Sequence, residues 1–150
     1  MIKNLSEYFL PEQEFYLQSI NYDRLNSVMS REEVFLNCTD NIHVERNENN
    51  GVKVTVTREL FFEPGEMFRL SVAFGADLQF DLQRAEEYDW NEVNLAEEFR
   101  DNGDFVILNL MSRITLLIAQ ITSSFGQQPL ILPPGISKSD NKMNPEKNNT

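Results

Sequence analysis

Apolar and polar residues alternate without a break from Phe68 to Leu82. The even-numbered positions are all apolar, and the odd-numbered positions between them are polar or small. Because successive side chains of a strand point to opposite faces, this pattern predicts one long strand with one apolar face and one polar face. A central strand of a parallel sheet would be apolar on both faces, so the pattern favours an open antiparallel sheet.

Three further segments have the same character, and they lie at residues 15–22, 33–46 and 52–63. In the second and third of these, most of the apolar residues again occupy even positions. Asn49-Asn50-Gly51 separates them and is typical of a tight turn, while Pro64-Gly65 marks a turn before the strand at residues 68–82. The last three strands are therefore predicted to form an antiparallel meander.

The periodicity changes to a helical one after residue 88. Asp89-Trp90-Asn91-Glu92 resembles a capping box and predicts a short helix that reaches about Arg100. Asp104 is placed to cap a second helix over residues 105–125. The predicted fold class is α+β, with a four-stranded antiparallel sheet (a meander) and two C-terminal helices packed on one face. We expect a single domain over residues 1–136 and a disordered polar tail over residues 137–150.

The second helix is apolar around more of its circumference than one sheet can cover. Its polar side chains fall within one narrow stripe, which consists of Asn109, Ser112, Arg113, Gln120 and Ser123. A helix that packs on a single sheet needs an apolar stripe only a little more than about 100° wide. In a chain this short, the economical cover for the excess is another subunit, so we predict a homo-oligomer.

The charge balance excludes several classes of partner. The chain has 24 acidic and 13 basic residues, and its net charge of −11 argues against binding to nucleic acid or to anionic membranes. The apolar run at residues 105–121 is interrupted by polar residues, so we expect no membrane insertion. The start of the chain lacks the apolar run of a signal peptide, and Cys38 is the only cysteine. We therefore predict a cytoplasmic protein without disulfides.

Little in the sequence suggests chemistry. His43 is the only histidine and lies on the polar face of its strand, while Cys38 lies on the apolar face, where a small buried residue is expected. We find no glycine-rich phosphate loop, no nucleophile elbow and no metal-spaced ligand set. The sequence predicts no catalytic residue, no metal and no cofactor, so the chain is not expected to be an enzyme; one that uses carboxylates alone is the alternative.

Large apolar side chains also occur outside the predicted core. Phe35, Phe61 and Met67 fall on the polar face of the sheet, while others lie in or near connections. Those in the connections are Trp90, Phe99, Phe125, Leu130, Ile131 and Leu132. They could pack against another subunit, or they could form an exposed apolar groove for an extended peptide.

Several short strings, in this order and at this spacing, resemble the SecB-type export chaperones. The resemblance covers roughly residues 13–134. It includes the opening strand at residues 15–20 (FYLQSI), the VTVT of residues 54–57 and the small pair Gly75-Ala76. Ser112-Arg113 in the long helix and the proline-and-leucine segment at residues 128–134 (QPLILPP) complete it.

The resemblance implies a tetramer, built as a dimer of dimers, whose helices lie between two larger sheets. Proteins of this family hold non-native polypeptides in long apolar grooves without ATP. Some deliver secretory precursors to the SecA motor, and some relatives protect an antitoxin. We therefore expect a holdase-type chaperone, with a dedicated single-partner interaction module as the alternative. The side chains expected to bind polypeptide are Phe61, Phe62, Trp90, Phe99, Phe125, Leu130, Ile131 and Leu132.

The chain departs from the family at the positions that contact SecA. Three family positions that carry acidic residues are occupied here by Arg24, Val28 and Ser71. None of these can attract the basic tail of the motor. Acids on or next to the polar face could replace them, and the candidates are Glu45, Glu59, Asp77 and Asp81.

Overall fold

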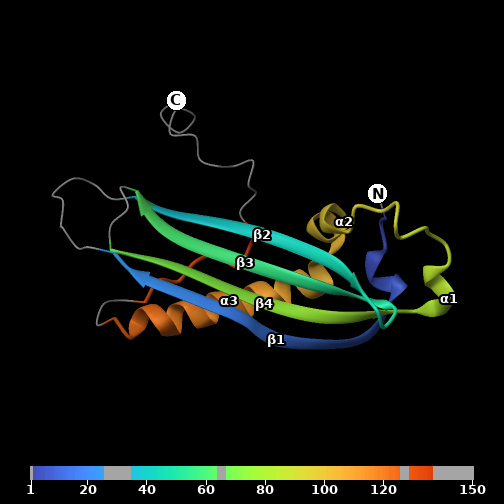
Figure 1. The fold of residues 1–150 in the computed structure, drawn as a ribbon, viewed down its shortest axis with the longest axis horizontal. Coiled ribbons are helices and arrows are strands. Elements are labelled where there is room, and N and C mark those ends of the chain that lie inside the picture. Colours follow the sequence, from blue (N-terminus) through green and yellow to red (C-terminus); the bar gives the residue numbers. More distant parts are fainter. Residues whose placement is uncertain (1, 26–34, 64–66, 126–128, 137–150) are drawn as a thin grey trace, which may run out of the picture.

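The computed structural model describes residues 2–25, 35–63, 67–125 and 129–136, which form a four-stranded antiparallel sheet and its helices (Figure 1). The strands are β1 (Phe9–Arg24), β2 (Phe35–Asn47), β3 (Gly51–Glu63) and β4 (Phe68–Phe80). The helices are η1 (Leu5–Tyr8), α1 (Leu82–Ala85), α2 (Leu95–Asn102) and α3 (Asp104–Ser123). The predicted fold class is confirmed, and the predicted tail at residues 137–150 lies outside the described residues.

The strand order is β1-β4-β3-β2, so the first strand is not the neighbour of the second. β2, β3 and β4 form the predicted meander, and β1 pairs with β4 from Phe9 opposite Phe80 to Arg24 opposite Phe68. Three consecutive strands with the remaining strand beside the last of them form a Greek key. β1 and β2 are therefore the two edges of the sheet.

The even-numbered face of the sheet is the buried one. Val54 pairs with Ala76 and Leu60 with Leu70, and all four side chains are fully buried. The opposite face is only partly polar, because the ring of Tyr16 on β1 covers Gly75 on β4. A Cβ atom at Gly75 would lie 2.6 Å from that ring, so the small residue allows the close approach.

The long strand ends earlier than its alternation predicts. β4 stops at Phe80, and Asp81 is the N-cap of α1, where its side chain accepts a hydrogen bond from the Gln83 backbone N–H at 3.1 Å. Leu82 lies in the first turn of that helix with 62% of its surface exposed. The alternation at residues 81 and 82 is therefore coincidental, since a cap at Asp81 turns the chain out of the sheet.

The predicted capping box at Asp89 is wrong. The Asp89 side chain accepts a hydrogen bond from the Asn91 backbone N–H at 3.1 Å, and this closes a turn rather than starting a helix. α2 begins at Leu95, and its cap is Asn94, whose side chain accepts from the Glu97 N–H at 3.2 Å. Both Asp and Asn can cap a helix, so the sequence alone placed the start too early.

The long helix α3 runs along the sheet and packs on β4 and β3, whereas α2 packs on β2 (Figure 1). α3 starts directly after Gly103, and Asp104 is the first residue of α3 instead of its predicted cap. With 20 residues and a mean hydropathy of 1.7, α3 is long and apolar enough to cross a membrane. The polar residues that interrupt its apolar run therefore do not by themselves exclude a membrane span. Only one side of α3 packs in the core, where Leu110, Met111 and Ile114 are fully buried.

Candidate polypeptide-binding surface

The acids predicted to face a partner are engaged within the chain. Glu59 forms an exposed ion pair with Arg69 at 3.6 Å, and Glu45 lies 3.8 Å from the exposed His43 side chain. Exposed pairs of this kind contribute little, about 0–1 kcal/mol, so they can be exchanged for a basic partner. The His43 side chain is exposed, as predicted.

The other two predicted acids have hydrogen-bonding roles. Asp77 accepts a hydrogen bond from the Tyr16 hydroxyl at 3.0 Å. Burial, together with this hydrogen bond, raises the pKa of Tyr16 to about 12. Asp81 caps α1, as described above. Both carboxylates therefore form hydrogen bonds that stabilise the fold of this chain.

Two of the predicted polypeptide-binding residues are core residues and leave no surface for a ligand. Phe99 is fully buried and Trp90 is 6% exposed, and both lie in an aromatic cluster with Phe9 and Phe80. The Trp90 indole N–H donates a hydrogen bond to the Ala85 carbonyl at 2.7 Å. Large aromatic side chains close the core at this end of the sheet, beneath the connections that follow β4.

Phe61 lies on the opposite face of the sheet from the other candidates. It is half-buried opposite Asn37, and the Arg69 guanidinium lies 6.0 Å from the centre of its ring. Phe62, the next residue, points to the helix side and packs against the core. Adjacent residues of a strand face opposite ways, so these two cannot line one surface.

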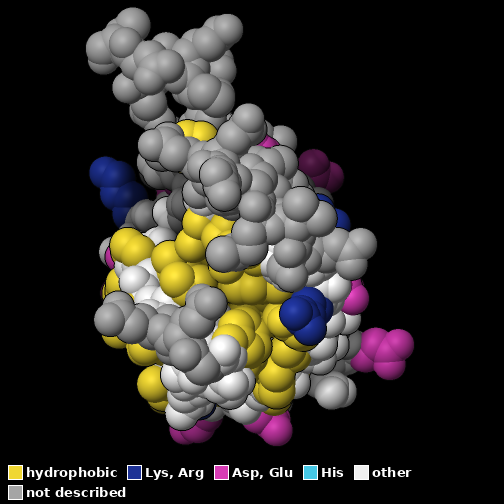
Figure 2. Space-filling view, turned by 90° about the vertical axis from the view of Figure 1, so that its left-hand side faces the viewer, with side chains coloured by type: hydrophobic (Ala, Val, Ile, Leu, Met, Phe, Trp, Pro, Cys, Tyr) yellow, Lys and Arg dark blue, Asp and Glu magenta, His cyan; other side chains and the backbone are white. Residues whose placement is uncertain are grey.

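The remaining candidates gather where β1, β3 and α3 end. Phe62, Phe68 and Phe125 pack with Tyr22, with ring centres 5.1–5.9 Å apart, and we call these four residues the aromatic end. Tyr22 and Phe125 are the most exposed of the four. Figure 2 views the molecule from this side and shows apolar side chains gathered on it. A concentrated apolar surface of this kind is typical of binding sites.

Residues 129–136, which we call the strap, follow α3 after a short gap in the described chain. Leu130 and Leu132 pack against the core, whereas Ile131 between them is 76% exposed. The strap contains no regular secondary structure. The Leu130 backbone N–H donates to the Thr122 hydroxyl at 2.8 Å, which fixes the beginning of the strap to α3. The predicted apolar packing of this segment is confirmed for its two leucines.

A buried ion pair fixes the other end of the strap. Arg58 of β3 donates to both carboxylate oxygens of Asp40 on β2, at 2.7 and 2.8 Å, and the Arg58 side chain is only 2% exposed. The same guanidinium donates to the Pro133 carbonyl at 2.8 Å and to the Gly135 carbonyl at 2.9 Å. Burial would lower the pKa of Arg58, but Asp40 outweighs the burial and raises it.

Neither Asp40 nor Arg58 was predicted as a functional residue, yet the sequence contains a signal. Each occupies an even position in a strand whose other even positions are mostly apolar. The two residues are also directly opposite each other in the register of β2 and β3. Opposite charges at two gaps in the apolar pattern indicate a buried pair once the register is known.

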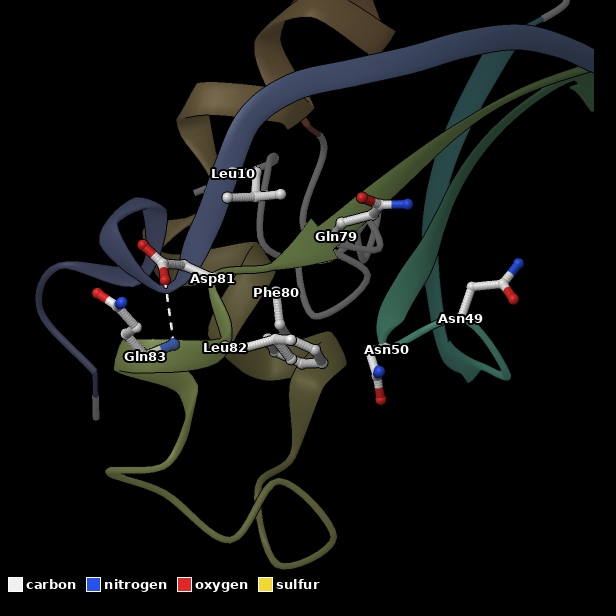
Figure 3. A pocket seen from close by; sticks show the side chains of 8 residues that line it. All are labelled: Leu10, Asn49, Asn50, Gln79, Phe80, Asp81, Leu82 and Gln83. Carbon is white, nitrogen blue, oxygen red and sulfur yellow. Dashed lines mark hydrogen bonds between the residues drawn. The ribbon is translucent and has the colours of Figure 1, made fainter.

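A separate cleft of about 330 Å³ lies at the other end of the sheet, between the β2–β3 turn and α1 (Figure 3). Its lining is mainly amide and apolar side chains, and Figure 3 shows them pointing apart rather than toward one centre. Among the described residues, no group of three or more His, Cys, Asp and Glu side chains could hold a metal ion. The lining side chains therefore do not converge on one point of the cleft.

No family model and no curated protein matches the sequence. Among solved structures, a protein of unknown function from Streptococcus agalactiae has a TM-score of only 0.41, with 13% identity over 81% of this chain and 95% of that chain. The Mycobacterium tuberculosis SecB-like chaperone Rv1957, in complex with a peptide of the HigA1 antitoxin, has a TM-score of 0.66. That match has 15% identity and covers 89% of this chain and 91% of the other. The four-stranded antiparallel sheet with its C-terminal helices therefore has the SecB-like chaperone fold.

Proposed function

We propose that this chain is an ATP-independent holdase chaperone of the cytoplasm, which binds extended apolar segments of non-native polypeptides. The observation that carries the proposal is the aromatic end, whose rings lie where α3 ends and where Thr122 of α3 accepts a hydrogen bond from the strap. The SecB-like fold supports it, since the similar Mycobacterium tuberculosis chaperone was solved with a peptide bound. Binding would need no catalytic residue.

The proposed mechanism is burial of client side chains in several weak contacts. Each buried apolar side chain of a client would contribute about 1.5–3 kcal/mol before the entropy of ordering is subtracted. Several such contacts along one client give avidity without a single tight site. The net charge of −11 would keep loaded complexes soluble and favour clients with basic segments.

We also propose that the chain assembles into a homo-oligomer, with a tetramer as the expected form. β1 is an edge strand, and Leu17 and Ile20 on it are 48% and 43% exposed although they lie on the helix side of the sheet. Leu108 and Leu116 of α3 are also exposed. An edge strand beside an apolar helix face is suited to pairing with a second copy. Sedimentation of the chain as a monomer at all concentrations would contradict this proposal.

A second candidate is a dedicated chaperone for one partner, such as an antitoxin. The antitoxin peptide in the Mycobacterium tuberculosis structure favours this candidate over a role in protein export. Export through SecA has less support, because Arg24 and Ser71 occupy family positions that would carry acids. Purification of the chain with its bound proteins separates the candidates. One stoichiometric partner would support the dedicated chaperone, and many different clients would support the general holdase.

The test of the proposed function is suppression of aggregation of an unfolded test protein. We expect Phe125→Asp to weaken the suppression at least several-fold, because it places a charge among the rings of the aromatic end. The matched control is Leu82→Asp, which changes an exposed leucine at the opposite end of the sheet. No suppression by the wild-type chain, or equal suppression by the two variants, would refute the proposal.

A further inference from the structure

The strap is held in the way that a protein holds an extended peptide of unspecified sequence. Its fixed points are backbone atoms: the Leu130 N–H and the Pro133 and Gly135 carbonyls. Its side chains divide between the protein and solvent, since Leu130, Leu132 and Ile136 pack against the core whereas Ile131 is exposed. Backbone hydrogen bonds together with pockets for alternate side chains are how extended peptides are usually bound.

The donors that hold the strap do not depend on the strap for their position. Asp40 is opposite Arg58 in the sheet register and engages the guanidinium through Nε and Nη2. A planar guanidinium fixed in this way directs its remaining N–H groups outward from the pair. Buried donors of this kind have to be satisfied, so any segment that replaced the strap would be selected for carbonyls at the same places.

We propose that the strap is the resident occupant of the polypeptide-binding site, and that a client segment displaces it and offers its own carbonyls to Arg58. This inference rests on the proposed function and identifies its site. The client is an extended segment with apolar side chains at alternate positions and two carbonyls two residues apart. Proline is tolerated where Arg58 binds, because the guanidinium contacts carbonyl oxygens only, as it does at Pro133.

Because a client has to displace the strap, the strap competes with the client and lowers the apparent affinity of the protein for it. A client binds only the fraction of molecules whose strap has left, so weakening the strap tightens client binding by the same factor. Leu132→Asp removes a leucine that packs against the core and should tighten binding by about tenfold or more. Ile131, which the sequence suggested as a binding residue, belongs under this proposal to the segment that the client displaces and not to the site. Ile131→Asp introduces the same charge at its exposed side chain and should leave the affinity unchanged.

The rate at which a thiol reagent modifies Cys38 reports on the site, and no engineered cysteine is needed. Cys38 is the only cysteine of the chain, it is half-buried, and it lies on the same strand face as Asp40 and beside Arg58. Burial raises the pKa of the Cys38 thiol, so labelling rates have to be compared over a pH series that separates access from ionisation. We expect the thiol to be labelled slowly in the wild-type chain and at least about tenfold faster in Leu132→Asp, where the strap is open more often.

The experiment uses the full chain and a synthetic capped peptide with the sequence of residues 129–136. The peptide should bind Leu132→Asp about tenfold more tightly than it binds wild type or Ile131→Asp, and it should return Cys38 labelling to the wild-type rate. Equal affinity for the three proteins would overturn the proposal. Binding to Leu132→Asp without protection of Cys38 would also overturn it, because the peptide would then occupy another surface.

Thr122→Val gives a second reading if Leu132→Asp does not fold. It removes the hydroxyl that accepts the Leu130 N–H and keeps the side-chain volume. As for Leu132→Asp, peptide binding should become tighter and Cys38 labelling faster, each by about threefold. No change in either quantity would overturn the proposal. Aggregation suppression by the wild-type chain separates the two proposals. If the chain suppresses aggregation but the variants do not change peptide affinity or Cys38 labelling, only the assignment of the strap site is refuted. If the chain neither suppresses aggregation nor binds the peptide, the proposed function is refuted as well.

Discussion

The buried pair of Asp40 and Arg58 makes a strong prediction about stability. Arg58→Met removes the guanidinium that pairs with the Asp40 carboxylate, whose side chain has no exposed surface. Removal of one member of a buried ion pair costs about 3–5 kcal/mol. Domains of this size are stable by about 5–15 kcal/mol, so the variant should be severely destabilised.

Replacing both members should restore most of that loss. In Arg58→Met with Asp40→Leu, no charge is left buried, and such replacements are often neutral or stabilising by about 1–4 kcal/mol. The two hydrogen bonds to strap carbonyls are lost as well, at about 1 kcal/mol each. The double variant should therefore lie within about 2 kcal/mol of wild type, and be more stable than Arg58→Met alone.

Urea unfolding followed by circular dichroism measures these differences. Arg69→Met is the matched control, because Arg69 pairs with Glu59 at 3.6 Å on the exposed face and should lose less than about 1 kcal/mol. Equal losses for Arg58→Met and Arg69→Met would refute the reasoning. A double variant no more stable than Arg58→Met would refute it too, because the buried Asp40 carboxylate that has lost Arg58 could then not be the source of the loss.

Three further predictions concern the helices and Tyr16. Ile114→Ala on the buried side of α3 should lower the free energy of unfolding by about 2–5 kcal/mol, and Leu116→Ala, at an exposed position, by far less in a dissociated monomer. Asn94→Ala removes the side-chain cap of α2 and should lower the free energy of unfolding by about 1 kcal/mol in the same urea assay. Tyr16→Phe should make the free energy of unfolding fall less steeply as the pH rises above about 10. Because the Tyr16 pKa is raised from 10.0 to about 12, its contribution to the free energy of unfolding is complete below pH 10 and is lost as the pH rises through about 12. A wild-type chain and variant with parallel stability curves over that range would contradict this.

The parts of the fold that the sequence predicts are those with a periodic apolar signal. The alternation from Phe68 onward predicts the sheet and its buried face correctly, because burial of one face leaves a mark at every second residue. It fails at Asp81, where local hydrogen bonding of a cap outweighs a pattern that continues by chance. The same competition between Asp89 and Asn94 moves the start of α2, since both side chains can hydrogen-bond to nearby N–H groups.

The candidate surface is harder to predict, because it depends on which connections meet in space. Trp90 and Phe125 are both aromatic residues next to helices, yet one lies in the core and the other at the aromatic end. Their sequence context does not separate them. Arg58 contacts the strap across 75 positions, which no local pattern reveals. Only the tertiary arrangement places these groups together.

The pairing of β1 with β4 has a consequence for synthesis of the chain. β1 leaves the ribosome first, but its partner strand begins to emerge roughly 40 residues later, which corresponds to several seconds at ordinary rates of translation. Until then Leu17, Ile20 and Tyr22 have no neighbouring strand and no helix beside them. During that interval the nascent chain is itself a polypeptide with an unpaired apolar strand, the kind of client that we propose the finished protein holds.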